Sequence, residues 1–313
     1  MTETGTDYSA GAAFIDGAYV PVGEAKIPIL DWGFLKTDAT YDVVHVWKGS
    51  FFRLDDHLDR FERSVAGLRM SLPHSRDEVV DILMECVRRA GLRDAYVQML
   101  CTRGVPPPGV RDPRTCQNRF AVFAIPFGWI ANAEQRRRGL HMILSSVPRI
   151  APESVNPTIK NYHWGDFVRA LFAAYDKGAE TTVLVDGRGN LTEGPGFNIF
   201  VIRDAKVSTP ARGVLEGITR RTVLELCREI GVEAELGTVP AEALHEADEV
   251  FITSTAGGVM PVTRVDDRIL GNGAPGPITT RIHDLYWSKK EAGWYATPVD
   301  YAARGGTPDR RQG

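Results

Sequence analysis

The chain has 313 residues, of which 43% are hydrophobic and 25% are charged, and its formal net charge at pH 7 is −3. This composition is typical of a globular protein with a sizeable core, and the slightly acidic balance argues against a general nucleic-acid-binding protein, which would show a basic face. No apolar run approaches the length of about 18 residues that a membrane helix needs, and a signal peptide's basic start and apolar centre are missing. The four cysteines lack the CxxC or CxH spacing of a zinc site, so we expect reduced thiols, no metal and a cytoplasmic setting.

The first half of the chain predicts a small mixed α/β domain over residues 13–144, after a polar and disordered stretch at 1–12. Its elements in chain order are hairpins at 13–22 and 41–54, helices at 55–70 and 75–91, and strands at 95–104 and 119–127. The second helix has the clearest boundaries: Ser75 and Glu78 have capping-box spacing, and Gly91 follows its last turn.

A larger domain is predicted over residues 158–298. The segment 145–157, "SSVPRIAPESVNP", is rich in Ser and Pro without an apolar period, which predicts an interdomain linker. Residues 299–313 predict a disordered tail. The elements of the larger domain in chain order are a helix at about 164–178, a hairpin at 181–202, a loop entering a helix at 213–231, and two strands around a Gly-Gly turn at 247–267.

Two segments of the second half have the composition of anion sites. "EGIT" at 216–219 places Gly217 and backbone N–H groups at a helix N-terminus, where the helix dipole favours a phosphate. "TSTAGG" at 253–258 places three hydroxyls and two glycines after a strand. A plain helix cap and a plain turn would explain the same residues. "RLDDHLDR" adds Arg53, His57 and Arg60 as phosphate candidates, with a charged surface helix as the alternative.

Lys160 and Glu193 stand in unusual surroundings. Lysine is scarce, with eight in the chain, and Lys160 lies beside Asn161, Tyr162 and Trp164 rather than on a charged helix face. Glu193 lies in the apolar segment "LTEGPGFNIF", where a buried acid needs a partner, either an arginine or a protonated ring nitrogen. An amine, a carboxylate for a ring nitrogen and a phosphate cradle are the groups that pyridoxal phosphate requires.

The chain resembles the fold type IV pyridoxal-phosphate enzymes, which include branched-chain and D-amino-acid aminotransferases, aminodeoxychorismate lyase and R-selective amine transaminases. The resemblance covers nearly the whole chain and rests on six motifs in combination: "DWGFLKTDATYD", "FRLDDHLDRF", "TIKNYHWGD", "LTEGPGFNIF", "LEGITR" and "TSTAGG". Within this family the motifs look most like those of the R-selective amine transaminases. The resemblance implies a two-domain α/β (α+β) fold with a small N-terminal domain and a larger, β-barrel-like C-terminal domain.

The resemblance also implies a role for individual residues. Lys160 forms the Schiff base with the cofactor and transfers the proton, in a ping-pong exchange between an amine and pyruvate. Glu193 holds the pyridine nitrogen. The phosphate would contact Arg60, Ile218, Thr219 and Thr255, and the substrate pocket would contain Lys36, Tyr41, Arg111 and Trp164. The family's active sites borrow a loop from a second subunit, which implies a homodimer.

Two departures from the family patterns concern the substrate. "VPPPGVRDP" replaces the Arg-x-His pair of standard D-amino-acid aminotransferases, and its Arg111 matches the mobile arginine with which amine transaminases hold a keto-acid carboxylate. Lys36 stands where those enzymes carry histidine, so it is either a second carboxylate contact or a solvent-facing lysine. The alternatives that stay open are a D- or branched-chain amino-acid aminotransferase, a lyase of the same fold, and a catalytically silent binding protein.

Overall fold

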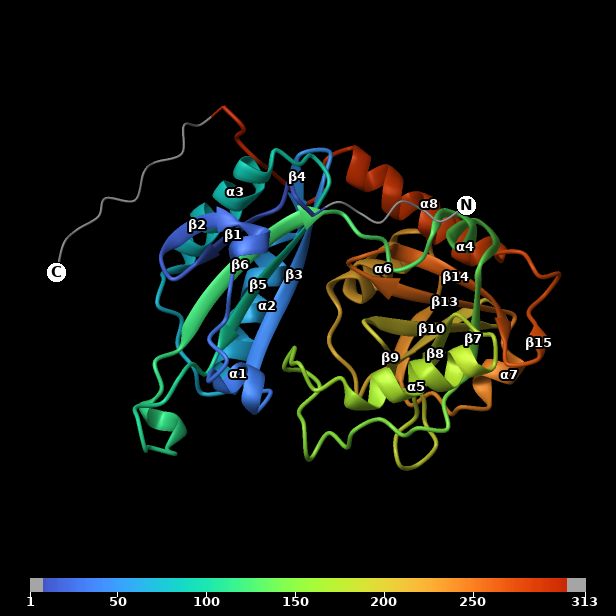
Figure 1. Cartoon of the computed structure of the whole chain (residues 1–313). Coiled ribbons are helices and arrows are strands. Elements are labelled where there is room, and N and C mark those ends of the chain that lie inside the picture. Colours follow the sequence, from blue (N-terminus) through green and yellow to red (C-terminus); the bar gives the residue numbers. More distant parts are fainter. Residues whose placement is uncertain (1–7, 303–313) are drawn as a thin grey trace.

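The computed structural model describes residues 8–302 and contains two β-sheets that lie side by side (Figure 1). The first is seven-stranded and antiparallel throughout. In spatial order its strands are β16 (Ala296–Pro298), β4 (Ser50–Phe52), β3 (Ala39–Trp47), β5 (Ala95–Thr102), β6 (Arg119–Pro126), β1 (Ala12–Ile15) and β2 (Ala18–Pro21). Both hairpins predicted for the first half are confirmed. Their turns at Asp16-Gly17 and Lys48-Gly49 have positive φ at both central residues, which matches the right-handed twist of the strands.

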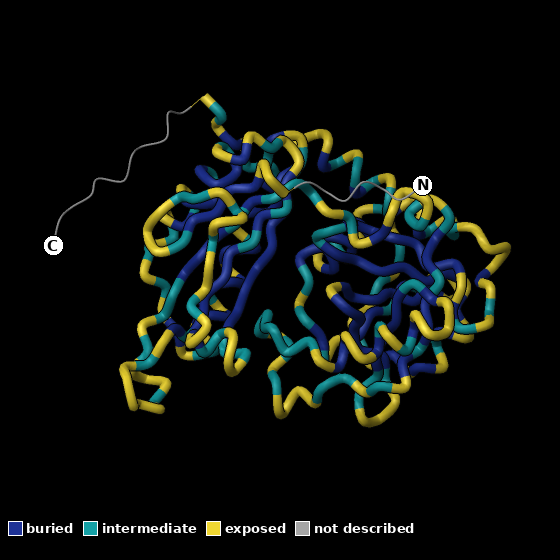
Figure 2. Tube along the Cα trace, in the orientation of Figure 1, coloured by how far each residue is buried: buried dark blue, intermediate teal, exposed yellow. Residues whose placement is uncertain are grey.

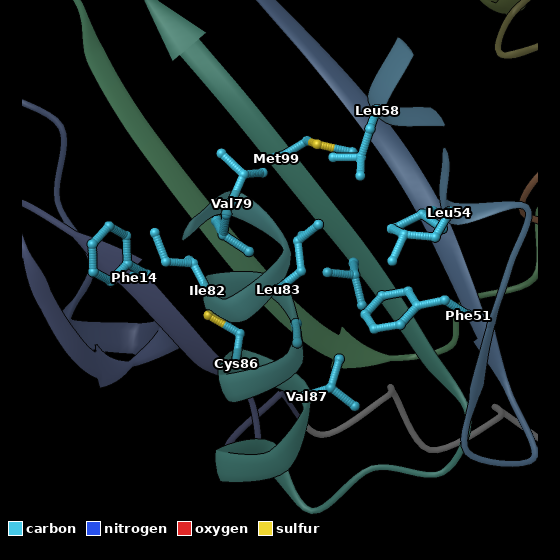
Figure 3. Close-up of a cluster of buried hydrophobic side chains, with 14 of the residues drawn as sticks. Phe14, Phe51, Leu54, Leu58, Val79, Ile82, Leu83, Cys86, Val87 and Met99 are labelled. Atoms are coloured by element: carbon cyan, nitrogen blue, oxygen red, sulfur yellow. The ribbon is translucent and has the colours of Figure 1, made fainter. Parts of the chain in front are cut away.

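Two helices cover one face of this sheet, α2 (Leu54–Gly67) and α3 (Arg76–Ala90). The capping box of Ser75 and Glu78 is present, and Gly91 follows α3 with a φ of 66°. The apolar stripes of both helices pack on the strands in a continuous core, which contains Leu58, Leu83 and Met99 (Figure 3). The opposite face of the sheet carries Tyr41 and Val43 and is turned toward the second half of the chain.

The second sheet is nine-stranded and curls back toward itself. Along its main path lie β12 (Ala234–Gly237), β11 (Lys206–Pro210), β10 (Phe197–Arg203), β13 (Glu249–Ser254), β14 (Gly258–Val265), β7 (Leu140–Leu144) and β8 (Thr181–Val183), with β15 (Arg268–Ile269) on β14 and β9 (Glu193–Gly194) on β10. Backbone hydrogen bonds between Leu184 and residues 192–193 bring the end of β8 to β9, which pairs with β10. This closure confirms the barrel-like character predicted for the larger half.

Helices surround the second sheet. They are α4 (Ala133–Arg138), α5 (Gly165–Asp176), α6 (Ile218–Glu229), α7 (Ala243–Glu246) and α8 (Pro277–Glu291), while α1 (Trp32–Leu35) and the 3-10 turns η1 (Val22–Glu24) and η2 (Pro113–Thr115) belong to the first half. Buried residues concentrate in the strands of both halves, and exposed residues in the loops and outer helix faces (Figure 2). Among residues 8–302, no helix is long and apolar enough to cross a membrane.

The predicted domain boundaries need correction at both ends of the larger half. Because β7 already pairs with β8 and β14, the chain crosses between the halves near residues 127–132 and not at 145–157, which is a long surface loop of the second half. Composition marks such a loop and a linker in the same way. At the other end, β16 returns to the first sheet, and Val299 and Tyr301 pack on its core, so the predicted tail begins later than residue 299. The rest of the predicted tail, and residues 1–7, lie outside the described part of the chain.

Candidate active site

One cavity of about 540 Å³ lies between the two sheets. The first sheet contributes Tyr41, Val43 and Tyr96 to its wall, and the second contributes Glu193 and Thr253. Most of the residues that the sequence singles out line this cavity: Arg60, Lys160, Glu193, Ile218, Thr219, Thr255, Tyr41 and Trp164. They come from segments that are far apart in the sequence, and the packing of the two halves brings them together.

Strand β3 fixes the position of Lys160. The backbone oxygen of Lys160 accepts hydrogen bonds from the Tyr41 N–H at 3.1 Å and from the Thr40 hydroxyl at 2.7 Å. The Lys160 Nζ lies 4.4 Å from the centre of the Tyr41 ring. Burial and then the positive charge of Arg60 lower the pKa of Lys160 to about 8, although Asp42 and Glu193 oppose the change. A substantial fraction of this amine is therefore neutral near pH 8, as nucleophilic attack requires.

Glu193 is buried and has the arginine partner that its surroundings demand. Burial raises the pKa of the Glu193 carboxyl, and Arg149 and the Leu215 amide oppose that rise. Arg149 donates to Glu193 Oε1 at 3.2 Å and to Asp166 Oδ2 at 2.7 Å, while the Leu215 N–H donates to Glu193 Oε2 at 2.8 Å. Both oxygens of Glu193 are thus held in place at the cavity wall, in an orientation that these contacts fix.

The buried carboxylate of Asp42 holds the guanidinium of Arg60 in place. Its Nε and Nη2 donate to the two oxygens of Asp42 at 2.7 and 2.8 Å, and the His57 Nδ1 lies 2.8 Å from Asp42 Oδ1. Burial alone would raise the pKa of Asp42, but Arg60 and His57 hold it well below its usual range. The remaining nitrogen, Nη1, donates to the Glu216 backbone oxygen at 3.2 Å. Asp42 therefore fixes the plane of the guanidinium, and Nη1 points toward the start of α6.

The N-terminus of α6 has the features of a phosphate cradle. Its N-cap residue, Gly217, provides no side-chain hydrogen bond to the first-turn amides, so these donors are open to an anion. A Cβ on Gly217 would lie 2.0 Å from Asn198 Oδ1, so only glycine fits there. The buried Thr253 hydroxyl lines the same cavity without a hydrogen-bond partner among the described residues. An orphaned hydroxyl, free amides and Arg60 together fit the phosphate group of pyridoxal phosphate.

Four predicted residues do not line this cavity, and one of them is His57, whose Nδ1 lies against Asp42. The sequence makes Arg53 a candidate for phosphate, but helix α2 begins after it, and its side chain turns away to Asp56 and Glu225. Lys36 is exposed and lines a second cavity of about 380 Å³, which shares Ile159, Asn161 and His163 with the first. Arg111 is exposed on the loop between β5 and β6.

Sequence patterns alone do not single out Asp42 and Arg149. Asp42 lies in the apolar strand "YDVVHV", and the argument that singles out Glu193, an acid inside a buried strand, could have found it. Arg149 lies in the Ser- and Pro-rich segment for which composition predicts a linker, where no periodic pattern marks a buried side chain. Only the folded loop shows that this arginine reaches two buried carboxylates.

One cavity thus brings together an amine with a lowered pKa, a carboxylate in a fixed orientation and a phosphate cradle. Enzymes that depend on pyridoxal phosphate require these three groups. Known proteins narrow the class. The chain matches the amino-transferase class IV family over residues 39–265. It is 32% identical to a putative branched-chain-amino-acid aminotransferase of Methanocaldococcus jannaschii, over 87% of this chain and 94% of that protein. It is 28% identical to the branched-chain-amino-acid aminotransferase of Escherichia coli K12, over 92% and 94%.

Solved structures agree with this relationship. A branched-chain amino acid aminotransferase from T.th., solved with pyridoxamine 5'-phosphate, superposes with a TM-score of 0.87 at 30% identity, over 94% of this chain and 100% of that chain. The branched-chain aminotransferase of Thermoproteus uzoniensis, solved with norvaline, gives 0.85 at 28% identity, over 92% and 99%. The chain belongs to the class IV aminotransferase family and is a pyridoxal-phosphate-dependent aminotransferase of fold type IV.

Proposed function

We propose that this enzyme exchanges an amino group between an apolar amine and a keto acid, with R-selective amine:pyruvate transamination as its principal activity. The observation that carries the proposal is the charge of the cavity. Among the described residues, the lysine and arginine side chains that line it are Arg60, Arg149 and Lys160. The guanidinium groups of Arg60 and Arg149 are paired with buried carboxylates, and Lys160 is needed for the reaction. Within residues 8–302, the wall of this cavity therefore offers no free cation, and a substrate carboxylate must be met by a residue from outside the wall.

An apolar part of the cavity wall suits an aryl-alkyl amine. Tyr41, Val43, Tyr96, Ile125 and Trp129 line the cavity with rings and aliphatic groups, which favour burial of an apolar substituent. Such a donor has no carboxylate that would need a partner. The motif combination that includes "ATYDVVHVWKGSFFRLDDHLDR" and "GPIT" supports the same branch of the family.

The chain's own residues would divide the chemistry as follows. When bound, pyridoxal phosphate supplies an aldehyde that the amine attacks and a ring that delocalises an electron pair. Lys160 would take the proton from the donor carbon and release it again, because its lowered pKa lets the amine accept and release a proton near neutral pH. Glu193, held by Arg149, would accept a hydrogen bond from the protonated ring nitrogen. Arg60, Ile218, Thr219 and Thr255 would hold the phosphate.

The keto-acid acceptor does have a carboxylate, and we assign its recognition to the exposed cations Lys36 and Arg111. Lys36 lies on the second cavity, which shares the lining residues Asn161 and His163 with the first. Arg111 would reach the site by movement of its loop, either within the chain or across a homodimer.

The exposed apolar side chains of Ile29, Leu30 and Phe34 support such a dimer, because 61–74% of their surface is accessible in the single chain.

Branched-chain amino-acid transamination is the second candidate, since the relatives described above carry that name. An apolar wall would accept a branched side chain as readily as an aryl group. The two candidates differ in whether the donor's carboxylate finds a cation.

Single-donor half-reactions separate the candidates. Purified holoenzyme would be mixed without acceptor with (R)-1-phenylethylamine, its S enantiomer, D-alanine or L-leucine, and loss of the visible cofactor absorbance would be followed. Bleaching fastest with the R amine supports the proposal. Bleaching by L-leucine or D-alanine alone would overturn the donor assignment and leave the aminotransferase chemistry in place.

A further inference from the structure

The proposed phosphate cradle is assembled from two helices of different halves. Helix α2 belongs to the first half and carries Arg60, whereas α6 belongs to the second half and begins at the cradle with Ile218 and Thr219. Across this junction Arg60 makes one hydrogen bond, from Nη1 to the Glu216 oxygen at 3.2 Å. The distance between arginine and helix terminus must be set by contacts elsewhere along the two helices.

Four charged side chains join the same two helices farther along. Arg53 donates to Asp56 Oδ2 at 2.8 Å and also to the carboxylate of Glu225, Arg221 pairs with Asp56, and the Arg221 Nε lies 3.8 Å from Glu225 Oε1. Each helix, with its flanking cap residue, contributes one cation and one anion, so opposite charges alternate around a closed ring. We call Arg53, Asp56, Arg221 and Glu225 the α2–α6 clasp.

The clasp and the cradle lie at two levels of one antiparallel helix pair. Arg53 and Arg60 are seven residues apart, and so are Ile218 and Glu225, which corresponds to about two helical turns or about 10 Å in each helix. Going along α2 from Arg53 to Arg60, the partners run backward along α6, from Glu225 through Arg221 to Glu216. A shift of one helix at the clasp is therefore transmitted to the cradle.

Arg53 is the most constrained member of the clasp. Its side chain is only 1% exposed, and its guanidinium carbon lies 3.9 Å from the centre of the Tyr295 ring and 5.2 Å from that of Trp294. The Arg53 N–H donates to the Tyr295 oxygen at 3.0 Å. The Arg53 backbone has a φ of 55°, a conformation that non-glycine residues keep only where the surroundings enforce it. Contacts from α2, from α6 and from the segment before β16 therefore fix the position of the Arg53 side chain.

We propose that Arg53 is a positioning residue for the cofactor phosphate. Through Asp56 and Glu225 it holds α6 against α2, so that Thr219 and Arg60 face the same phosphate group. The inference rests on the proposed placement of that phosphate between the two helices. Arg53 acts on the phosphate site through the two helices, since its own side chain does not line the cavity.

The test measures retention of the cofactor rather than turnover. Holoenzyme carrying Arg53→Met, Glu225→Gln or both substitutions would be dialysed to equilibrium against graded pyridoxal phosphate, and bound cofactor read by absorbance. We expect the dissociation constant to rise about tenfold in each single variant. The double variant should be no worse than the more severe single variant, because either change opens the same ring. Glu229→Gln is the matched control, because Glu229 pairs with Lys289 one turn along α6 and not with α2.

Two results would overturn the inference. One is that Arg53→Met and Glu225→Gln lower the thermal midpoint while the dissociation constant stays within about twofold of wild type, since a merely structural clasp would behave so. The other is an equal loss of cofactor in Glu229→Gln. If Arg53→Met fails to fold, Glu225→Gln and Asp56→Asn decide the question, because these side chains are partly exposed. Thr219→Ala tests the cradle itself: unchanged cofactor affinity in that variant would contradict the phosphate placement, not the clasp.

Discussion

At the scale of single residues, Lys160 differs in its surroundings from the exposed lysines of the described part of the chain. Its amine is held against the Tyr41 ring, next to Arg60, and the combination of burial and like charge keeps it partly neutral. We predict that Lys160→Ala lowers kcat at least about 10⁴-fold in a steady-state transamination assay, because both covalent capture and proton transfer are lost. Lys177→Ala, at an exposed position after α5, is the control and should retain wild-type turnover.

Arg149 acts indirectly, through the buried carboxylates that it holds in place. It neutralises Asp166 and Glu193, which are both buried, and its guanidinium carbon lies 4.1 Å from the centre of the Phe167 ring. We predict that Arg149→Met destabilises the protein by about 3–5 kcal/mol, measured by urea unfolding, because two buried carboxylates lose their partner. An unchanged unfolding midpoint would show that these carboxylates are solvated or protonated in the native protein.

At the scale of elements, the start of α6 depends on a glycine for space and not for backbone freedom. Gly217 has a φ of −63°, which any residue adopts, but a Cβ there would collide with Asn198 Oδ1. We predict that Gly217→Ala weakens pyridoxal phosphate binding by about 1–3 kcal/mol, measured by equilibrium dialysis, because the helix terminus must shift away from the cradle. Gly237→Ala, where a Cβ meets nothing within 4 Å, should bind the cofactor as wild type does.

Local sequence signals determine most of the secondary elements. The turns after β1 and β3, the capped helix α3 and the strand pair around Gly257-Gly258 all follow from patterns within a short window. The residues that the family motifs single out, Lys160, Glu193 and Arg60, line one cavity. Arg149 and the clasp residue Arg53 could not be placed, because their partners are distant in the sequence and no periodicity encodes long-range ion pairs.

At the scale of the whole molecule, the last part of the chain joins the two halves. Helix α8, in red at the top of Figure 1, packs on β14 of the second sheet and leads to β16, which pairs with β4 in the first. Neither the crossing nor the return of the chain can be predicted from local patterns, since strand order within a sheet depends on contacts between distant segments. Composition suggests a boundary at 145–157, where the fold has a loop.

The region where α8 joins the two halves contains a buried lysine whose hydrogen-bond partner is a histidine. Lys290 on α8 lies 2.9 Å from His45 Nδ1, and the rings of Phe52, Tyr286 and Trp287 surround its amine. Burial lowers the pKa of Lys290 from 10.5 to about 7, with only a partial opposing effect of Asp94. Between these two values the unfolded chain binds the proton that the folded chain has released, so folding stability rises with pH across this window.

We predict that Lys290→Met removes this pH dependence. In wild type the contribution of Lys290 to the free energy of unfolding should increase by up to about 1.4 kcal/mol per pH unit above pH 7. The comparison is urea unfolding of both proteins at several values between about pH 7 and 9, within the window where the two states differ in bound protons. Equal slopes in the two proteins would mean that Lys290 titrates at its ordinary value and is solvated at the junction.

The central claim is that Lys160 carries the cofactor between the two halves of this fold. The most direct measurement is reduction of the holoenzyme with borohydride, which makes the bond between lysine and cofactor permanent, followed by proteolysis and mass spectrometry. We predict a phosphopyridoxyl group on the peptide that contains Lys160 and on no other lysine. Its presence on another lysine, such as Lys36 or Lys290, with Lys160 unmodified, would contradict the account of the site.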